Sequence, residues 1–297
     1  MNRFMIGQFG KFDKLKQKKD FKQGFYGVEA CSMESEKEII NLYENAKKNN
    51  YKIAVHFPLR AGKWRLRDAQ YLSKDEEIKR QSYEYIENEL KYIRAISPQY
   101  VLFHYPKPVL LDSEIDWENW RFQDETEYYF DNEYSYEKFI TESEEFFRWL
   151  SYKSEEYNFT PVLEFDALNK YVCGTNIVEE LLEKYPRVKI CLDIARLHLQ
   201  SKIDYKFHSL KIVKKFAKYA EVIHVSNGRA EDNASRNHLP ALRTLSKEEG
   251  YANIKEYFDI IKKENNECKI LFEHRSDLIS DDELEDCYKY IYELLNC

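Results

Sequence analysis

The stretch PVLEFDALNKYVCGTNIVEELLEKYPRVKICLD, residues 161–193, contains the pattern that decides the fold. Two short apolar runs, at 161–166 and 188–193, flank a helix-like segment near 175–185. Their lengths predict a strand, a helix and a second strand. Strands that alternate with helices in this way are typical of α/β domains.

The same alternation continues outward to both ends of the chain. Six further apolar runs predict strands near 3–9, 24–30, 52–57, 100–105, 221–226 and 269–274. Six further segments have helical spacing of apolar residues and lie near 34–49, 75–96, 135–157, 206–219, 248–265 and 280–295. Only the link 11–23 is ambiguous.

Eight strands are the number that closes a parallel barrel. We therefore predict an α/β fold, a single (β/α)₈ TIM barrel, over residues 1–297. One domain is expected because no linker rich in Pro, Gly or Ser interrupts the chain. An open doubly wound sheet is the alternative fold, but no GxGxxG phosphate loop follows the first strand.

The composition limits the class of partner and the compartment. A net charge of −7 disfavours nucleic acid as the main partner, because phosphate contacts need clustered Lys and Arg. The six cysteines form no CxxC pair, so neither a zinc finger nor a small disulfide framework is expected. The N-terminal stretch lacks the apolar core of a signal peptide, and no segment is apolar enough to span a membrane. We expect a cytoplasmic protein with reduced thiols.

Two links that follow strands stand out. The link 58–74 is rich in basic residues, and the link 106–135 is long, acidic and aromatic. Links after strands lie at the C-terminal face of a barrel, where the active sites of such enzymes are found. For 106–135 we expect a lid, a subunit contact of a homodimer, or a solvated surface loop.

The most informative feature is the residue type at the ends of the strands. Six consecutive predicted strands each end in an apolar run followed by a metal-ligand type, namely His56, His104, Glu164, Asp193, His224 and Glu273. The C-terminal ends of barrel strands converge on one rim, so residues far apart in sequence can meet there. Burying several carboxylates together without a cation is costly, because like charges repel and lose hydration. The pattern therefore predicts a site for a divalent metal such as Zn²⁺, Mn²⁺, Co²⁺ or Mg²⁺.

The chain also resembles a known superfamily, the xylose isomerase-like TIM barrels, which include sugar isomerases, sugar epimerases and endonuclease IV. The resemblance covers nearly the whole chain. The motifs that carry it are GFYGVEA (24–30), VHFP (55–58), LFHYP (102–106), VLEFDA (162–167), CLDIARLH (191–198), IHVSN (223–227), NHLP (237–240) and LFEH (271–274).

The resemblance implies roles for the strand-end residues. The metal ligands shared by the sugar epimerases correspond to Glu164, Asp193, His224 and Glu273. In the endonuclease-like members, two histidines at the positions of His56 and His104 bind a further zinc with the equivalent of Glu164. In an isomerase or epimerase, these two histidines are instead expected to bind substrate.

A third zinc, which the endonuclease binds, is not expected in this chain. The resemblance places Arg196 where one of its histidine ligands would stand. The Asp-x-His pair of that site reads Arg236-Asn237-His238 here, so that only His238 remains as a ligand type. Guanidinium groups suit a sugar hydroxyl or a terminal phosphate, and Arg196 and Arg229 are therefore candidate substrate contacts.

These observations favour a metal-dependent isomerase or epimerase that acts on a small sugar or sugar phosphate. By the resemblance, Glu164 and Glu273 would be the catalytic pair, one removing a proton and the other returning it through an enediolate. The first alternative is a two-metal phosphoesterase or AP endonuclease that uses His56 and His104. A lyase on the same scaffold and a barrel retained only for binding or regulation are further alternatives.

Three further polar residues lie beside these strand ends. Asp166 and Asn169 are expected either to support the site from behind or to cap a helix. His274 follows Glu273 on the same predicted strand, so its side chain should face away from the barrel mouth.

Overall fold

The computed structural model describes residues 1–120, 122, 124–229 and 238–296. Its main strands follow the order β1-β10-β9-β8-β7-β4-β3-β2, which is the order of a closed barrel. The strands are β1 (Phe4–Phe9), β2 (Gly27–Cys31), β3 (Lys52–His56), β4 (Tyr100–Tyr105), β7 (Thr160–Phe165), β8 (Lys189–Asp193), β9 (Ala220–Val225) and β10 (Lys269–Phe272). The predicted (β/α)₈ TIM barrel is confirmed and the open doubly wound sheet is wrong.

The helices and strands form two compact units. The first unit consists of Met1–Gly7, Asp13–Val28 and Ile190–Cys297, and the second of Gln8–Phe12 and Glu29–Lys189. We describe each unit by itself. The prediction of one domain over the whole chain stays a prediction.

The second unit contains three neighbouring parallel strands, β3, β4 and β7. Its helices are α2 (Glu36–Asn49), α3 (Glu76–Ile93), α4 (Tyr136–Tyr157), α5 (Lys170–Cys173) and α6 (Ile177–Lys184). Helix α4 begins after Ser135, whose side chain accepts a hydrogen bond from the Lys138 amide, and ends at Asn158 in the left-handed conformation. The stacked rings of Tyr71 and Phe146 lie in the core of this unit.

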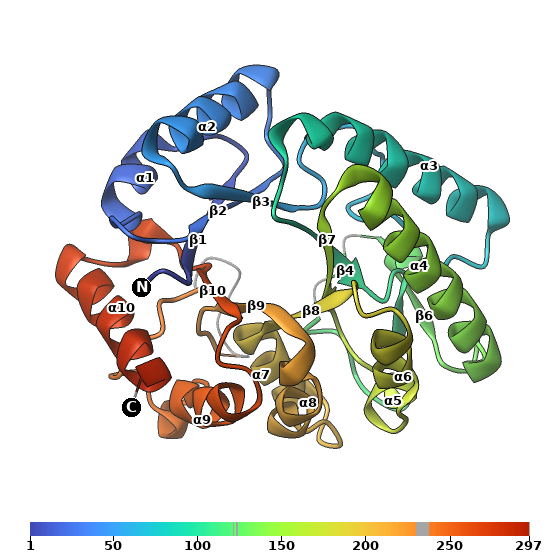
Figure 1. The fold of residues 1–297 in the computed structure, drawn as a ribbon. Coiled ribbons are helices and arrows are strands. Elements are labelled where there is room, and N and C mark those ends of the chain that lie inside the picture. The colour runs from blue at the N-terminus through green and yellow to red at the C-terminus, as the bar shows by residue number, and fades with distance from the viewer. Residues whose placement is uncertain (121, 123, 230–237, 297) are drawn as a thin grey trace. The chain divides into compact units, whose positions relative to one another are not determined.

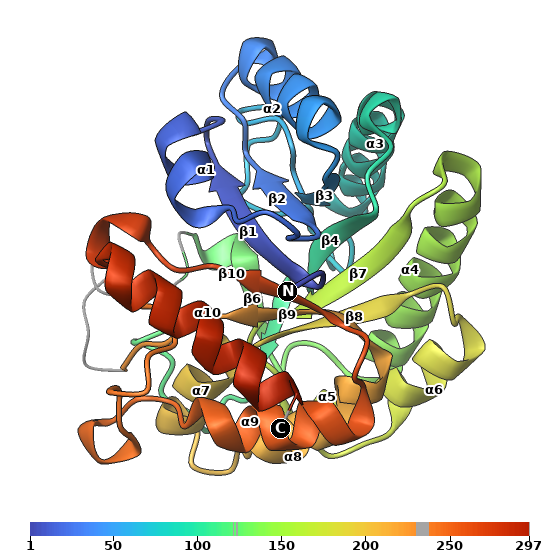
Figure 2. The ribbon, with the colours of Figure 1, turned by 60° about the vertical axis from the view of Figure 1, so that its left-hand side comes forward.

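The first unit contains β8, β9, β10 and the start of β1, paired in parallel. Its helices are α1 (Lys14–Asp20), α7 (Ile194–Ile203), α8 (Ser209–Phe216), α9 (Ile254–Glu264) and α10 (Asp281–Asn296). Helix α9 lies beside both α8 and α10 (Figures 1 and 2). Phe4 of β1, Phe272 of β10 and Tyr288 of α10 pack ring against ring, with the Phe272 and Tyr288 centroids 4.6 Å apart.

Helix α1 resolves the one ambiguous link. Its first turn is capped by Asp13, whose carboxylate accepts hydrogen bonds from the amides of Leu15 and Lys16. The second strand was predicted about three residues too early, since β2 begins at Gly27. Helix α7 was not predicted, because its polar and apolar residues do not separate onto two faces.

The link 106–135 has secondary structure of its own. Strands β5 (Val109–Leu111) and β6 (Tyr128–Phe130) form a separate two-stranded parallel sheet. Trp117 and Trp120 are buried, and the Tyr134 hydroxyl donates to the Leu72 carbonyl at 2.9 Å. The expectation of a solvated surface loop is therefore wrong for Trp117, Trp120 and Tyr134. The lid and the homodimer contact stay predictions.

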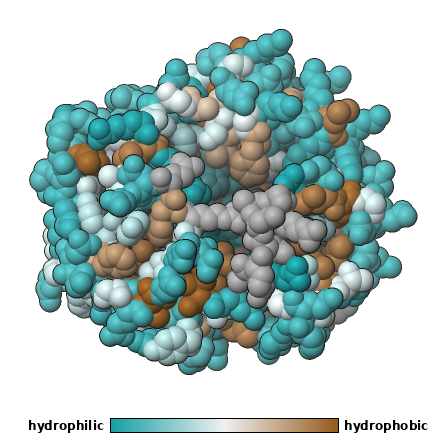
Figure 3. All heavy atoms as spheres, turned by 180° about the vertical axis from the view of Figure 1, so that it is seen from behind, coloured by the Kyte–Doolittle hydropathy of each residue, from teal (hydrophilic) through white to brown (hydrophobic). Residues whose placement is uncertain are grey.

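The molecular surface agrees with the high content of charged residues. Hydrophilic side chains cover most of the face in Figure 3, and hydrophobic ones gather in small separate patches. No described helix combines the length and the apolar character needed to cross a membrane. No disulfide joins the five cysteines within the described part of the chain.

Candidate functional site

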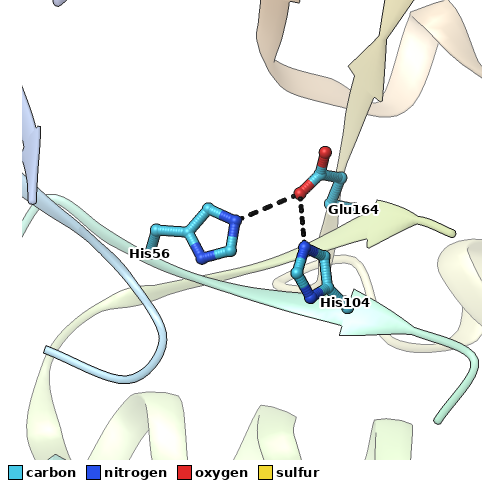
Figure 4. A group of neighbouring side chains, drawn as sticks. All are labelled: His56, His104 and Glu164. Atoms are coloured by element: carbon cyan, nitrogen blue, oxygen red, sulfur yellow. Dashed lines mark ion pairs between the residues drawn. The ribbon is translucent and has the colours of Figure 1, made fainter. Parts of the chain in front are cut away.

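In the second unit, two histidines converge on one carboxylate oxygen. His104 on β4 and Glu164 on β7 are direct neighbours across the strand pair, and His56 is the last residue of β3. The Nε2 atoms of His56 and His104 lie 3.3 Å and 3.2 Å from the same Oε2 of Glu164 (Figure 4). All three side chains are buried. The structure thus brings these three strand-end residues together.

The surroundings of His56 favour a positive charge. Its Nδ1 lies 3.3 Å from the carbonyl oxygen of Phe57. Burial alone would lower the pKa of His56, but Cys31 and Glu164 outweigh it and hold the pKa well above its usual range. A proton, a metal ion or a donor group of a ligand would satisfy this preference.

Two buried residues that the sequence analysis missed lie behind His104. Oδ1 of Asp68 lies 2.8 Å from His104 Nδ1, and Oδ2 lies 2.9 Å from Nζ of Lys107. Lys107 also pairs with Asp166 at 2.7 Å and is only 1% exposed. No local pattern marks Asp68 or Lys107, because each lies in a link whose path depends on the rest of the fold.

This buried network is held together by its charges. Burial alone would raise the pKa of the Asp68 carboxyl, but His104 and Lys107 hold it well below its usual range. Burial would likewise lower the pKa of Lys107, but Asp166 and Asp68 raise it. Asp68 is therefore a carboxylate, and the buried ammonium group of Lys107 bridges it to Asp166.

In the first unit, a second trio offers two carboxylates and one imidazole. Asp193 on β8 and His224 on β9 are direct neighbours across the strand pair, and Glu273 follows β10. His224 Nδ1 lies 3.5 Å from Glu273 Oε2. One ligand atom from each residue lies within 4.8 Å of the other two. The structure thus also brings these three strand-end residues together.

Both trios have the donor chemistry of a metal site. Nitrogen from imidazole and oxygen from carboxylate are ligands of Zn²⁺ and Mn²⁺. The Asp193 trio carries two negative charges against one in the Glu164 trio, so its donor set suits a divalent cation better. That Glu164 joins Asp193, His224 and Glu273 in one quartet stays a prediction.

The remaining predicted contacts in the first unit lie at different distances from this trio. Nδ1 of His238 is 3.8 Å from Glu273 Oε2, and its backbone is left-handed with a φ of 60°. Nε of Arg196 is 3.6 Å from Asp193 Oδ2. The Arg229 guanidinium lies 5.0 Å from the centroid of the Tyr251 ring. His238 and Arg196 thus contact the trio, whereas the Arg229 guanidinium lies over an aromatic ring.

The other polar predictions have clear outcomes. Asn169 caps α5, as its side chain accepts from the Tyr171 amide, and Asp166 accepts from the indole N–H of Trp120 at 3.1 Å. His274 is buried, with Nε2 3.8 Å from Asp20 of α1, as a structural role predicts. Arg236 and Asn237, which bear on the third zinc, lie outside the described residues.

Comparison with solved structures supports the same fold. A D-tagatose 3-epimerase-like protein superposes with a TM-score of 0.62 at 16% identity, covering 98% of this chain and 97% of that one. The IOLI protein, solved with a bound zinc atom, has a TM-score of 0.64 at 12% identity and coverages of 99% and 98%. D-psicose 3-epimerase from Clostridium cellulolyticum H10 has a TM-score of 0.58 at 14% identity and coverages of 98% and 99%.

No protein-family model matches the chain, and no curated protein matches it. The structural neighbours are xylose isomerase-like TIM barrel proteins. At these identities, the likeness shows a shared fold.

Proposed function

We propose that this protein is a divalent-metal-dependent isomerase or epimerase of a small sugar or sugar phosphate. The observation that carries the proposal is the Asp193, His224 and Glu273 trio, whose donor atoms lie within 4.8 Å of one another. Sugar epimerases among the structures with the same fold add support for the class of reaction. The substrate within that class is not part of the proposal.

A metal held by this trio, with Glu164 as the fourth ligand inferred from sequence, would polarise a carbonyl and acidify the neighbouring C–H bond. Glu273 and Glu164 would act on opposite faces of the substrate, as the family resemblance implies. One carboxylate would take the proton from carbon, and the other would return a proton to the enediolate. His56 and His104 would contact substrate oxygens, and Arg196, Arg229 and His238 are the proposed further contacts.

Solvent deuterium provides the test. Candidate ketoses and their phosphates are incubated in D₂O with Mn²⁺ or Zn²⁺, and deuterium at the carbon beside the carbonyl is measured by mass spectrometry. Incorporation by the wild type should disappear in Glu164→Gln and in Glu273→Gln. Glu142→Gln, which changes a buried glutamate of helix α4, is the matched control and should keep the activity.

The result is read against these controls. Incorporation that persists in both active-site variants would rule out the two-carboxylate mechanism. Absence of incorporation with every ketose tried, in a protein that does bind metal, would count against the isomerase class.

A two-metal phosphoesterase is the second candidate. The observation that favours it is the trio of His56, His104 and Glu164, which is itself a possible metal site. Cleavage of abasic-site DNA with added Zn²⁺ or Mn²⁺ at low salt tests this candidate directly. Nucleic acid stays disfavoured by the acidic net charge of −7. We also propose a cytoplasmic location, because the five described cysteines are free thiols.

A further inference from the structure

The proton of the His104 ring has two acceptors to choose from. Nδ1 faces Asp68 Oδ1 at 2.8 Å in hydrogen-bond geometry. Nε2 lies 3.2 Å from Glu164 Oε2, yet it makes no hydrogen bond within the described residues. In a neutral imidazole only one nitrogen carries hydrogen, and the geometry places it on Nδ1.

The position of Asp68 is itself over-determined. Lys107 holds Oδ2 of Asp68 at 2.9 Å and is held in turn by Asp166 at 2.7 Å. Asp166 accepts a hydrogen bond from Trp120, which anchors the link 106–135. The acceptor that faces His104 Nδ1 is therefore fixed by three further buried side chains.

We propose that Asp68, clamped by Lys107 and Asp166, is a positioning residue that keeps the His104 proton on Nδ1 and presents Nε2 as a hydrogen-bond acceptor beside Glu164. A bare Nε2 can accept a hydrogen bond from a substrate hydroxyl, whereas a protonated Nε2 would donate to Glu164 instead. The substrate role rests on the proposed function. The assignment of the ring tautomer is independent of the proposed function.

A neutral side chain at position 68 should reverse the tautomer. In Asp68→Asn the stronger acceptor for the ring proton becomes the charged carboxylate of Glu164. The proton then moves to Nε2, which blocks the acceptor and weakens Glu164 as a base. The variant should slow deuterium incorporation by about 10-fold or more, the range typical for losing a carboxylate behind a functional histidine.

Nitrogen NMR on metal-free protein labelled with ¹⁵N-histidine tests the inference. Spectra are taken near about pH 9, where neutral imidazole predominates for an ordinary histidine. The His104 signals are identified by their loss in His104→Gln. We expect the Nδ1–H tautomer in the wild type and the Nε2–H tautomer in Asp68→Asn. Asp131→Asn, which removes a carboxylate paired with Lys170 in the same unit, should leave the His104 signals unchanged.

Either of two results would overturn the inference. One is an Nε2–H tautomer in the wild type. This measurement uses no variant, so it tests the inference even if Asp68→Asn does not fold. The other is a folded Asp68→Asn that retains Nδ1–H. A wild type with the expected tautomer but no deuterium incorporation would contradict the proposed function and leave the positioning role of Asp68 standing.

Discussion

The Asp193 carboxylate caps helix α7, since its Oδ1 accepts a hydrogen bond from the Arg196 amide at 3.1 Å. The same side chain is a member of the trio with His224 and Glu273. One carboxylate thus serves both the helix and the candidate metal site. The cap needs only the oxygen of Asp193, whereas a metal ion and the nearby Arg196 guanidinium also interact with its negative charge.

Substitutions at Asp193 should separate these two roles. Asn is as good a helix cap as Asp, so Asp193→Asn should leave the free energy of unfolding of the metal-free protein within about 0.5 kcal/mol of wild type. Asp193→Ala loses the cap and should cost about 1 kcal/mol. Both should lose the metal. Urea unfolding and elemental analysis check this, and an Asn variant as unstable as the Ala variant would refute the capping argument.

Metal content should distinguish the two candidate functions. The proposed isomerase predicts one divalent ion per chain in the wild type, unchanged in a His56→Ala/His104→Ala double variant. An Asp193→Ala/His224→Ala variant should contain almost none, because it removes two of the three trio ligands. Elemental analysis after reconstitution measures all three proteins. Two ions that fall to one in the histidine variant would favour the phosphoesterase instead.

Removing Lys107 should destabilise the protein strongly. Lys107→Met leaves Asp68 and Asp166 buried with no ammonium between them, and a broken buried ion pair costs about 3–5 kcal/mol. Lys79→Met is the matched control, since its partner Glu142 keeps a second lysine, Lys138, at 3.4 Å. Lys79→Met should lower the free energy of unfolding by only about 1 kcal/mol. Equal losses in the two variants, measured by urea unfolding, would show that the bridge has no special weight.

His274 should make the fold sensitive to mild acid. Burial lowers the pKa of His274 from 6.5 to about 4, so the folded protein keeps the ring neutral. Below its unfolded pKa, the unfolded chain binds a proton that the folded one excludes, and stability falls as the pH drops through this window. Protonation of His274 in the unfolded chain should lower the free energy of unfolding by about 3 kcal/mol by about pH 4.

A substitution isolates this contribution. His274→Phe should fit beside the rings of Phe272 and Tyr288 and should lose less stability than wild type between about pH 7 and about pH 4. His208→Gln changes an exposed histidine and should follow the wild-type curve. Unfolding free energies at several pH values provide the measurement. Parallel curves for wild type and His274→Phe would contradict the assignment.

The barrel strands and the residue types at their ends were readable from the sequence alone. Each strand is a short apolar run that must be buried. The position of that run along the chain therefore determines where the residue at or near its end, such as Asp193 or Glu273, lies in the barrel. The ambiguous link and helix α7 were harder, because α1 is short and α7 has no clear apolar face. Local pattern therefore determined the fold class and placed the candidate site residues at the strand ends.

The support behind those residues was decided only by the tertiary structure. Asp68 and Lys107 lie in links, and Trp120 belongs to a segment with its own small sheet. Nothing in their local sequence distinguishes them from surface charges or aromatics. They meet His104 and Asp166 because the backbone path of each link brings them inward, and a buried charge is tolerated there only when the opposite charge arrives from another part of the chain.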